Sequence, residues 1–157
     1  MIDAGQPAPP VLLTDQDGHV VDLAELRGRL VVLYFYPRDE GVGCTAQACD
    51  IRDRWAAFEE RGVAVFGVSA DDVDAHASFA AAHGLPHRLL ADPDRSVIEA
   101  YGSWGLRTRR DGTQAMSVQR NTFLIDREGR IAAAWKEVDP AEHAQLVLDA
   151  VDRLDPS

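Results

Sequence analysis

The sequence predicts an α/β domain in which helices flank a central mixed sheet. Two continuous apolar runs rich in β-branched and aromatic residues, Leu30–Tyr36 and Val63–Ser69, are typical of strands buried on both faces. A helix is expected after each run, from apolar spacing after the first and from a capping aspartate and a terminal glycine after the second. The segments NTFLID and RIAAAWKEV, joined at Arg127-Glu128-Gly129, indicate a β-hairpin, and a last helix follows. Strand–helix alternation that ends in a hairpin and a helix favours a mixed sheet covered on both faces.

The elements of the first third follow from turn residues and apolar spacing. The segment GQPAPPVLLTDQDG is proline-rich and then briefly extended, with a turn at Asp17-Gly18. Residues Leu23–Gly28 predict a helical turn that glycine closes. Pro37 ends the first buried strand, and a loop leads to a helix that Gly62 ends. Apolar residues three and four apart define the buried stripe of this helix: Ala48, Ile51, Trp55 and Phe58.

The helix after the second buried strand has clear signals at both ends. Asp71 or Asp72 caps its start, and it runs to about His83, where Gly84 follows. His76 lies one heptad before His83 on the same helix face. We expect both histidines on the solvent side, without a role.

The remaining elements are shorter. The segment HRLLAD predicts a short strand and DRSVIEAYG a short helix. Residues Gly102–Ser117 have the composition of a loop. The final helix is expected to begin near Pro140. This order of elements is that of a thioredoxin-like domain.

Length and composition limit the class of protein. A chain of 157 residues without repeats, low-complexity tracts or linkers predicts one domain, residues 1–157. The formal net charge of -10 argues against a nucleic-acid partner. The start has no signal-peptide pattern, and no apolar run approaches the roughly 18 residues that span a membrane. We therefore expect a cytoplasmic protein without membrane contact, whose thiols are reduced at first.

The stretch PRDEGVGCTAQAC, residues 37–49, contains both cysteines of the chain. Cys44 falls where the loop meets the predicted helix, and unpaired N–H groups and the helix dipole favour the thiolate there. The same position faces the carboxyl end of the strand Leu30–Tyr36, the edge at which ligands bind in open α/β sheets. Cys44 is therefore a candidate nucleophile.

Cys49 lies five residues after Cys44. On a helix this spacing turns the side chain by roughly 140° and separates the Cα atoms by roughly 8.7 Å. A disulfide tolerates at most about 7 Å, so the two cysteines cannot bond while the helix stays wound. A redox pair that needs local unwinding and two inert buried thiols both remain open. Zinc would need four ligands, and the five histidines show no metal-ligand spacing with the cysteines.

The active-site segment resembles that of the peroxiredoxins, in particular the bacterioferritin-comigratory, or Q-type, branch. That branch reads F-Y-P-K-x-x-T-P-G-C-T-x-x-A-C, with a resolving cysteine five residues after the peroxidatic one. YGSWG at Tyr101–Gly105 and RNTFLID at Arg120–Asp126 also match, in the expected order over nearly the whole chain. The positions that match around the cysteines are Phe35, Tyr36, Pro37, Gly43, Cys44, Thr45, Ala48 and Cys49, followed by Arg52 and Asp53.

The resemblance implies a thioredoxin-like peroxiredoxin fold and a thiol peroxidase that needs no metal ion or cofactor. It implies that the Cys44 thiolate attacks a peroxide, that Arg120 stabilises the thiolate and the developing charge, and that Pro37 shields the sulfur. Gly43 and Thr45 complete the supporting motif. The resulting sulfenic acid would condense with Cys49, and thioredoxin or a similar dithiol would reduce the disulfide.

One position departs from the family motif. Gly41 stands where the family has Thr or Ser, whose hydroxyl hydrogen-bonds the thiolate and the peroxide, and Val42 replaces the proline that usually follows. Losing one such donor could cost on the order of 10²–10³ in rate. The alternative function is accordingly a slow thiol-based redox sensor with weak or no turnover. A disulfide reductase is disfavoured because the chain has no C-x-x-C.

The resemblance also suggests partners. We expect hydrogen peroxide and small organic hydroperoxides as substrates, and a monomer or at most a weak homodimer, because no separate dimerising arm is evident. Arg107, Arg109 and Arg110 could dock an acidic reductase, although a solvated loop is the simpler interpretation. Trp104 is expected to pack near the active-site pocket, by analogy with the family.

Overall fold

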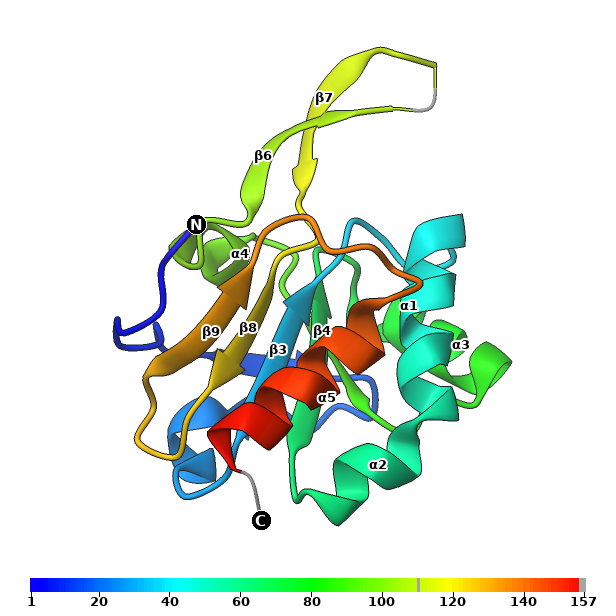
Figure 1. Cartoon of the computed structure of the whole chain (residues 1–157). Coiled ribbons are helices and arrows are strands. Elements are labelled where there is room, and N and C mark those ends of the chain that lie inside the picture. Colours follow the sequence, from blue (N-terminus) through cyan, green and yellow to red (C-terminus); the bar gives the residue numbers. More distant parts are fainter. Residues whose placement is uncertain (110, 156–157) are drawn as a thin grey trace.

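The computed structural model describes residues 1–109 and 111–155, and a seven-stranded mixed sheet forms its centre (Figure 1). The order of the strands is β2-β1-β5-β4-β3-β8-β9. The α/β fold class is therefore confirmed. The strands of this sheet are β1 (Leu12–Asp15), β2 (Val20–Asp22), β3 (Val31–Phe35), β4 (Ala64–Ser69), β5 (Arg88–Ala91), β8 (Thr122–Ile125) and β9 (Ile131–Trp135).

Strand β3 occupies the middle of the sheet. It pairs in parallel with β4 and antiparallel with β8, with Val32 opposite both Val65 and Leu124. All five residues of β3 are buried, as the continuous apolar run predicted. The predicted hairpin is β8–β9, and Asp126–Arg130 connect its strands.

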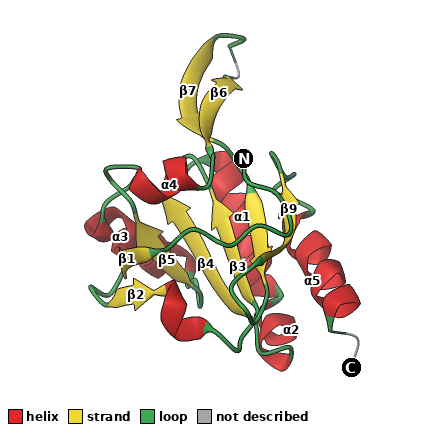
Figure 2. Cartoon of the chain, turned by 90° about the vertical axis from the view of Figure 1, so that its left-hand side faces the viewer, coloured by secondary structure: helices red, strands yellow, loops and turns green. Residues whose placement is uncertain are grey.

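The two faces of β3 belong to two separate cores. Val32 and Tyr34 face a core that also includes residues of helices α1, α2, α3 and α5. Val31 and Leu33 face the other core, beneath α4 and the N-terminal segment. Figure 2 shows α4 in front of the sheet and α1 behind it. The helices are α1 (Val42–Asp53), α2 (Trp55–Glu60), α3 (Val73–His83), α4 (Ser96–Ala100), α5 (His143–Leu154) and the 3-10 helix η1 (Leu23–Leu26).

Several predicted helix ends are confirmed. Asp72 caps α3 by accepting a hydrogen bond from the N–H of Ala75, and Gly84 ends it in the left-handed region at φ 59°. The last helix begins at His143, slightly later than the predicted start near Pro140. Within the described chain, no helix is long and apolar enough to cross a membrane.

The prediction of one helix from about Ala48 to Gly62 was wrong. The helix breaks at Arg54, whose φ of -111° and ψ of 18° are not helical, and two helices result. The apolar stripe nevertheless continues across the break, because Ile51 of α1 and Phe58 of α2 are buried in the same core. The apolar spacing therefore could not reveal that the helix is interrupted at Arg54.

The predicted loop at Gly102–Ser117 is instead mostly a β-hairpin. In the described part of the chain, strands β6 (Trp104–Thr108) and β7 (Gln114–Val118) pair with each other and not with the main sheet, and Figure 1 shows them projecting from the body of the domain. Leu106 and Met116 face each other in this register, and both side chains are exposed. Each strand carries only two alternating apolar residues, Trp104 and Leu106 in β6 and Met116 and Val118 in β7, which is too short an alternation to stand out among the surrounding glycine and polar residues. Arg110 of the predicted arginine group lies outside the described residues.

The expectation that His76 and His83 face solvent was also wrong. The His76 side chain is fully buried, and the His83 side chain is 25% exposed. Both belong to the face of α3 that packs on the segment before α1, because His76 contacts Asp39 and His83 contacts Glu40. The heptad spacing correctly placed the two histidines on one face, but that face points inward.

Two further buried histidines lie in the core on the α1 side of the sheet. The hydroxyl of Tyr34 is 2.7 Å from Nε2 of His87, and Thr122 Oγ1 is 3.0 Å from Nε2 of His143. Burial lowers the pKa of His87 from its usual 6.5 to about 3. Burial, followed by the charges of His87 and Arg120, lowers the pKa of His143 to about 3 as well. Both imidazoles are therefore neutral in the folded protein near neutrality.

We expect these two histidines to make the stability of the folded protein depend on pH. The unfolded chain binds a proton at each histidine below about pH 6.5, whereas the folded protein does so only near pH 3. We predict that the free energy of unfolding falls as pH decreases from 6.5, by up to about 1.4 kcal/mol per pH unit for each histidine. Urea unfolding of the wild type and of His87→Gln between pH 7 and pH 5 measures this slope. The variant should show the shallower slope, and parallel curves would contradict the assignment.

Candidate active site

Cys44 is the third residue of α1 and lies beyond the carboxyl end of β3. Its side chain is buried, with a relative exposure of 2%. Gly41, the N-cap residue of α1, has an extended backbone and gives no side-chain cap, and the first intrahelical bond runs from the N–H of Thr45 to the carbonyl of Gly41. The sulfur is therefore set within the first turn, where the positive end of the helix dipole favours an anion.

Arg120 supplies the positive charge at the sulfur. Its Nη1 lies 3.2 Å from Sγ of Cys44, and within the described chain it is the one side chain hydrogen-bonded to that sulfur. The sheet register explains the approach. Thr122 pairs with Tyr34 across the antiparallel β3–β8 ladder, and the chain just before β8 therefore runs beside the end of β3. The backbone N–H of Arg120 donates to Oε1 of Glu137, which holds this segment in place.

Gln47 is a member of the site that the sequence interpretation missed. Arg120 Nη1 also donates to Oε1 of Gln47 at 3.2 Å, so one guanidinium nitrogen is shared between the sulfur and this amide. Gln47 is fully buried, and its Nε2 has no protein partner among the described residues. Its position three residues after Cys44 on one helix face was the available signal.

Gly43 leaves room for the Arg120 guanidinium beside the first turn of α1. A Cβ at this position would lie 2.6 Å from Nη2 of Arg120, which is closer than real Cβ contacts. The glycine of the motif therefore permits Arg120 to lie over the first turn of α1. At Gly41 the situation differs, because a Cβ there would make ordinary contacts of 3.5 Å with Cys44 Sγ and with the carbonyl oxygen of Arg38.

The remaining predicted site residues lie around this centre. Pro37 is half-buried between β3 and α1. The Thr45 side chain is half-buried, and in the part of the chain that the structure describes its hydroxyl makes no hydrogen bond to the sulfur. Cys49 lies on the same helix with intermediate burial, and both thiols are free. Because α1 is wound over both cysteines, the structure shows the pair separated.

The tyrosines behind the sulfur retain their protons. Burial raises the pKa of Tyr34 well above its usual value, and the neighbouring charge of a Cys44 thiolate raises it further. Burial is also the main reason that the pKa of Tyr36 is raised well above 10. Both hydroxyls therefore remain hydrogen-bond donors throughout the physiological pH range.

Among residues 1–109 and 111–155, two groups of side chains have the types and spacing of metal ligands, and neither includes a cysteine. One consists of Asp39, Asp71 and His76, and the other of Asp15, Asp17 and His19. In the first group the side chains already bond to one another and to the backbone. In the second group Arg88 Nε lies 3.7 Å from Oδ2 of Asp15 and disfavours a cation, while Asp17 and His19 are exposed.

A family model and curated relatives both match most of the chain. The AhpC/TSA family matches residues 4–134. A putative peroxiredoxin bcp of Coxiella burnetii is 42% identical over 153 residues, 98% of this chain and 99% of the relative. The peroxiredoxin Bcp of Bacillus subtilis is 39% identical, over 96% of this chain and 95% of the relative.

Solved structures show the same similarity in three dimensions. The bacterioferritin comigratory protein of Xanthomonas campestris, studied for its alkyl peroxide reduction activity, superposes with a TM-score of 0.88 at 30% identity, over 97% of this chain and 99% of the other. BcpB of Mycobacterium tuberculosis superposes with a TM-score of 0.87 at 30% identity over the full length of both chains.

The space around Gly43 leads to a test of the site. We predict that Gly43→Ala lowers the rate at which Cys44 reacts with peroxide, because the new methyl group displaces the guanidinium. The loss of this donor should cost about 10²–10³ in rate. Stability should change little, since the displaced atoms are the end of a flexible side chain. Stopped-flow oxidation and thermal unfolding measure the two effects.

Gly105→Ala is the matched control. A Cβ there would lie 2.6 Å from Nε2 of Gln119, so it also displaces the end of a flexible side chain, but one that does not contact the sulfur. If both variants slow the reaction equally, the effect does not come from the Arg120 guanidinium.

Proposed function

Since the chain belongs to the AhpC/TSA family and is a peroxiredoxin of the Bcp, or Q-type, branch, we propose that Cys44 reduces hydrogen peroxide and small organic hydroperoxides. The observation that supports this assignment most directly is the contact of 3.2 Å between Arg120 Nη1 and the Cys44 sulfur at the start of α1. The thiolate, not the thiol, is the nucleophile, and both the guanidinium and the helix end favour the thiolate.

In the first step the Cys44 thiolate attacks one oxygen of the peroxide. The S–O bond forms as the O–O bond breaks, the sulfur is oxidised to sulfenic acid, and the other oxygen leaves as hydroxide or alkoxide and takes a proton to give water or an alcohol. Arg120 would stabilise the charge that develops on the oxygens, because arginine is a fixed cationic donor and its Nη1 contacts both the sulfur and Gln47. Pro37 has no N–H that could compete for the sulfur.

In the second step the Cys49 thiol attacks the Cys44 sulfenic acid, water leaves, and a disulfide forms. The first turns of α1 must unwind for this step, because a wound helix keeps the Cα atoms roughly 8.7 Å apart and a disulfide needs about 7 Å or less. Thioredoxin or a similar dithiol then reduces the disulfide and restores both thiols. We propose that the protein acts as a monomer, or as a weak homodimer, in the cytoplasm.

A slow redox sensor is the second candidate function, and Gly41 is the observation that favours it. Among the described residues, Arg120 is the one side chain that donates to the sulfur, and no hydroxyl takes the place of the Thr or Ser that the family motif has at position 41. A sensor would be oxidised slowly and would not turn over. Sustained peroxide consumption in the presence of thioredoxin distinguishes the enzyme from the sensor.

The two cysteines have different predicted roles, and substitutions separate them. Cys44→Ser should abolish peroxide consumption. Cys49→Ser should react once with peroxide and then stop as sulfenic acid, unless an external thiol is added. Intact-mass spectrometry after peroxide treatment identifies the oxidised species, and a coupled thioredoxin assay measures turnover. Equal turnover of the wild type and Cys44→Ser would refute the proposed function.

The missing hydroxyl can be restored. We predict that Gly41→Ser accelerates the reaction of Cys44 with peroxide by up to about 10²–10³, because its hydroxyl can donate to the sulfur. The backbone at Gly41 has φ -66° and ψ 147°, which serine adopts without strain, and the Cβ fits at 3.5 Å from the sulfur.

Gly41→Ala provides the control, since it adds the same Cβ without the hydroxyl. Stopped-flow fluorescence of the reduced proteins mixed with peroxide compares the rates. If serine and alanine change the rate alike, the hydroxyl does not limit this protein.

A further inference from the structure

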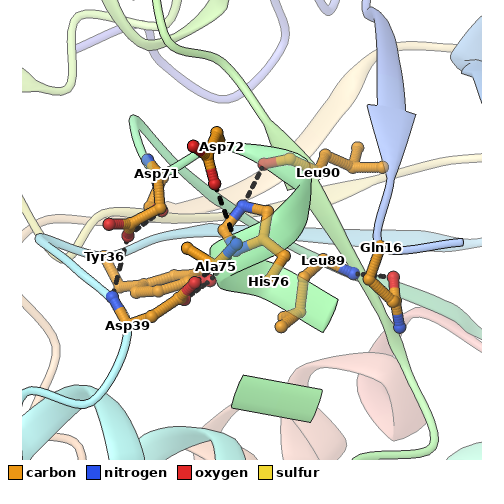
Figure 3. Close-up of polar contacts among 10 residues, drawn as sticks. Gln16, Tyr36, Asp39, Asp71, Asp72, Ala75, His76, Leu89 and Leu90 are labelled. Carbon is orange, nitrogen blue, oxygen red and sulfur yellow. Dashed lines mark hydrogen bonds and ion pairs between the residues drawn. The ribbon is translucent and has the colours of Figure 1, made fainter. Parts of the chain in front are cut away.

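A buried polar cluster lies behind the active-site segment that joins β3 to α1 (Figure 3). At its centre His76 of α3 contacts Asp39, which lies five residues before Cys44 in the chain. The His76 side chain is 0% exposed and the Asp39 side chain 5% exposed. Burying polar groups of this kind lowers the stability of the fold unless they are fully hydrogen-bonded.

The hydrogen bonds of His76 define its protonation. Nε2 lies 3.0 Å from the backbone carbonyl of Leu90, which only accepts, so this nitrogen must donate. Nδ1 lies 2.6 Å from Oδ2 of Asp39. The second Asp39 oxygen accepts from the Tyr36 hydroxyl at 2.7 Å, and this hydroxyl keeps its proton because burial raises the pKa of Tyr36. One proton therefore lies between Asp39 and Nδ1, and the two side chains form a short hydrogen bond.

Asp39 is held through its backbone as well as through its side chain. The backbone N–H of Asp39 donates to Oδ2 of Asp71, which also accepts from the Ser69 hydroxyl at the end of β4. Asp39 is thus held by its side chain to α3 and by its backbone to the segment after β4. The next residue, Glu40, has a φ of 61°, in the left-handed region that non-glycine residues rarely adopt. This conformation persists only if its surroundings hold it.

The reactive turn begins directly after this anchored point. Gly41 is the N-cap residue of α1, and its carbonyl accepts the first helical hydrogen bond, 2.8 Å from the Thr45 nitrogen. Cys44 lies within this turn. Asp39 therefore lies two residues before the N-cap of the helix whose first turn brings the sulfur to Arg120.

We propose that Asp39 and His76 form a positioning pair that holds the first turn of α1 wound, with the Cys44 sulfur against Arg120. This inference rests on the proposed function, because it assigns the pair a role in both steps of that cycle. The wound turn favours the reaction with peroxide. The unwound turn favours disulfide formation with Cys49. The pair accordingly sets the balance between the two steps and does not contact the substrate.

The experiment compares the two steps in variants of the full chain. In His76→Gln and Asp39→Ala, oxidation of Cys44 by hydrogen peroxide should slow by about 10- to 100-fold, because small displacements of a reacting group have effects of this size. Disulfide formation from the sulfenic acid should become faster, and less sulfinic acid should accumulate at high peroxide. Stopped-flow fluorescence measures the rates, and intact-mass spectrometry measures the products.

Three further variants make the result specific to the pair. The double variant His76→Gln/Asp39→Ala should be no slower than the slower single variant, because the two residues act together. Asp39→Asn should recover part of the oxidation rate, since its amide can donate to a neutral His76 and still accept from Tyr36. His83→Gln, on the same helix face at the exposed contact with Glu40, should leave both steps unchanged.

A general loss of stability would slow the first step without accelerating the second. Equal slowing of both steps, or no change in either, would overturn the proposal. If His76→Gln does not fold, Asp39→Ala provides the same comparison.

Amide hydrogen exchange gives an independent measurement. In reduced Asp39→Ala and Asp39→Asn, the Thr45 amide should exchange faster than in the wild type, by a larger factor in the alanine variant, while amides of α5 keep their rates. Unchanged exchange at Thr45 would refute the positioning role even if the wild type proved inactive. Failure of the wild type to react with peroxide would refute the proposed function alone.

Discussion

The contact between the Arg120 guanidinium and the Cys44 sulfur is the interaction around which the site is arranged. Each partner comes from a different part of the chain, and the central strand β3 brings them together. Cys44 follows this strand in sequence, whereas Arg120 precedes the antiparallel neighbour β8. Because the two strands are antiparallel, the residue after β3 and the residue before β8 lie at the same end of the strands. Gly43 leaves space for the guanidinium, and Gln47 directs it.

The parts of the fold that the sequence could predict are those in which one local signal dominates. Continuous apolar runs identified β3 and β4, because strands buried on both faces need no alternation. Asp72 and Gly84 identified the ends of α3 for equally local reasons. The β6–β7 hairpin escaped prediction because among the described residues its strands pair with each other alone and bury little, so that each shows only two alternating apolar residues.

The site was predictable only in part, for a related reason. The spacing and position of Cys44 pointed to a reactive thiol. Arg120, however, was identified only through the resemblance to a family, because no local signal links two residues 76 positions apart. His76 was misplaced since histidine is compatible with either side of a helix. Its burial depends on Asp39, an acidic partner from another element that periodicity cannot reveal.

The interruption of the helix at Arg54 has a mechanical consequence. Helix α1 ends at Asp53, and α2 begins as a separate short helix whose Phe58 is anchored in the core. Unwinding that starts at the amino end of α1 can end at Arg54 without involving α2. We therefore expect the proposed rearrangement to be confined to α1, about three helical turns, while Phe58 holds α2 in the core.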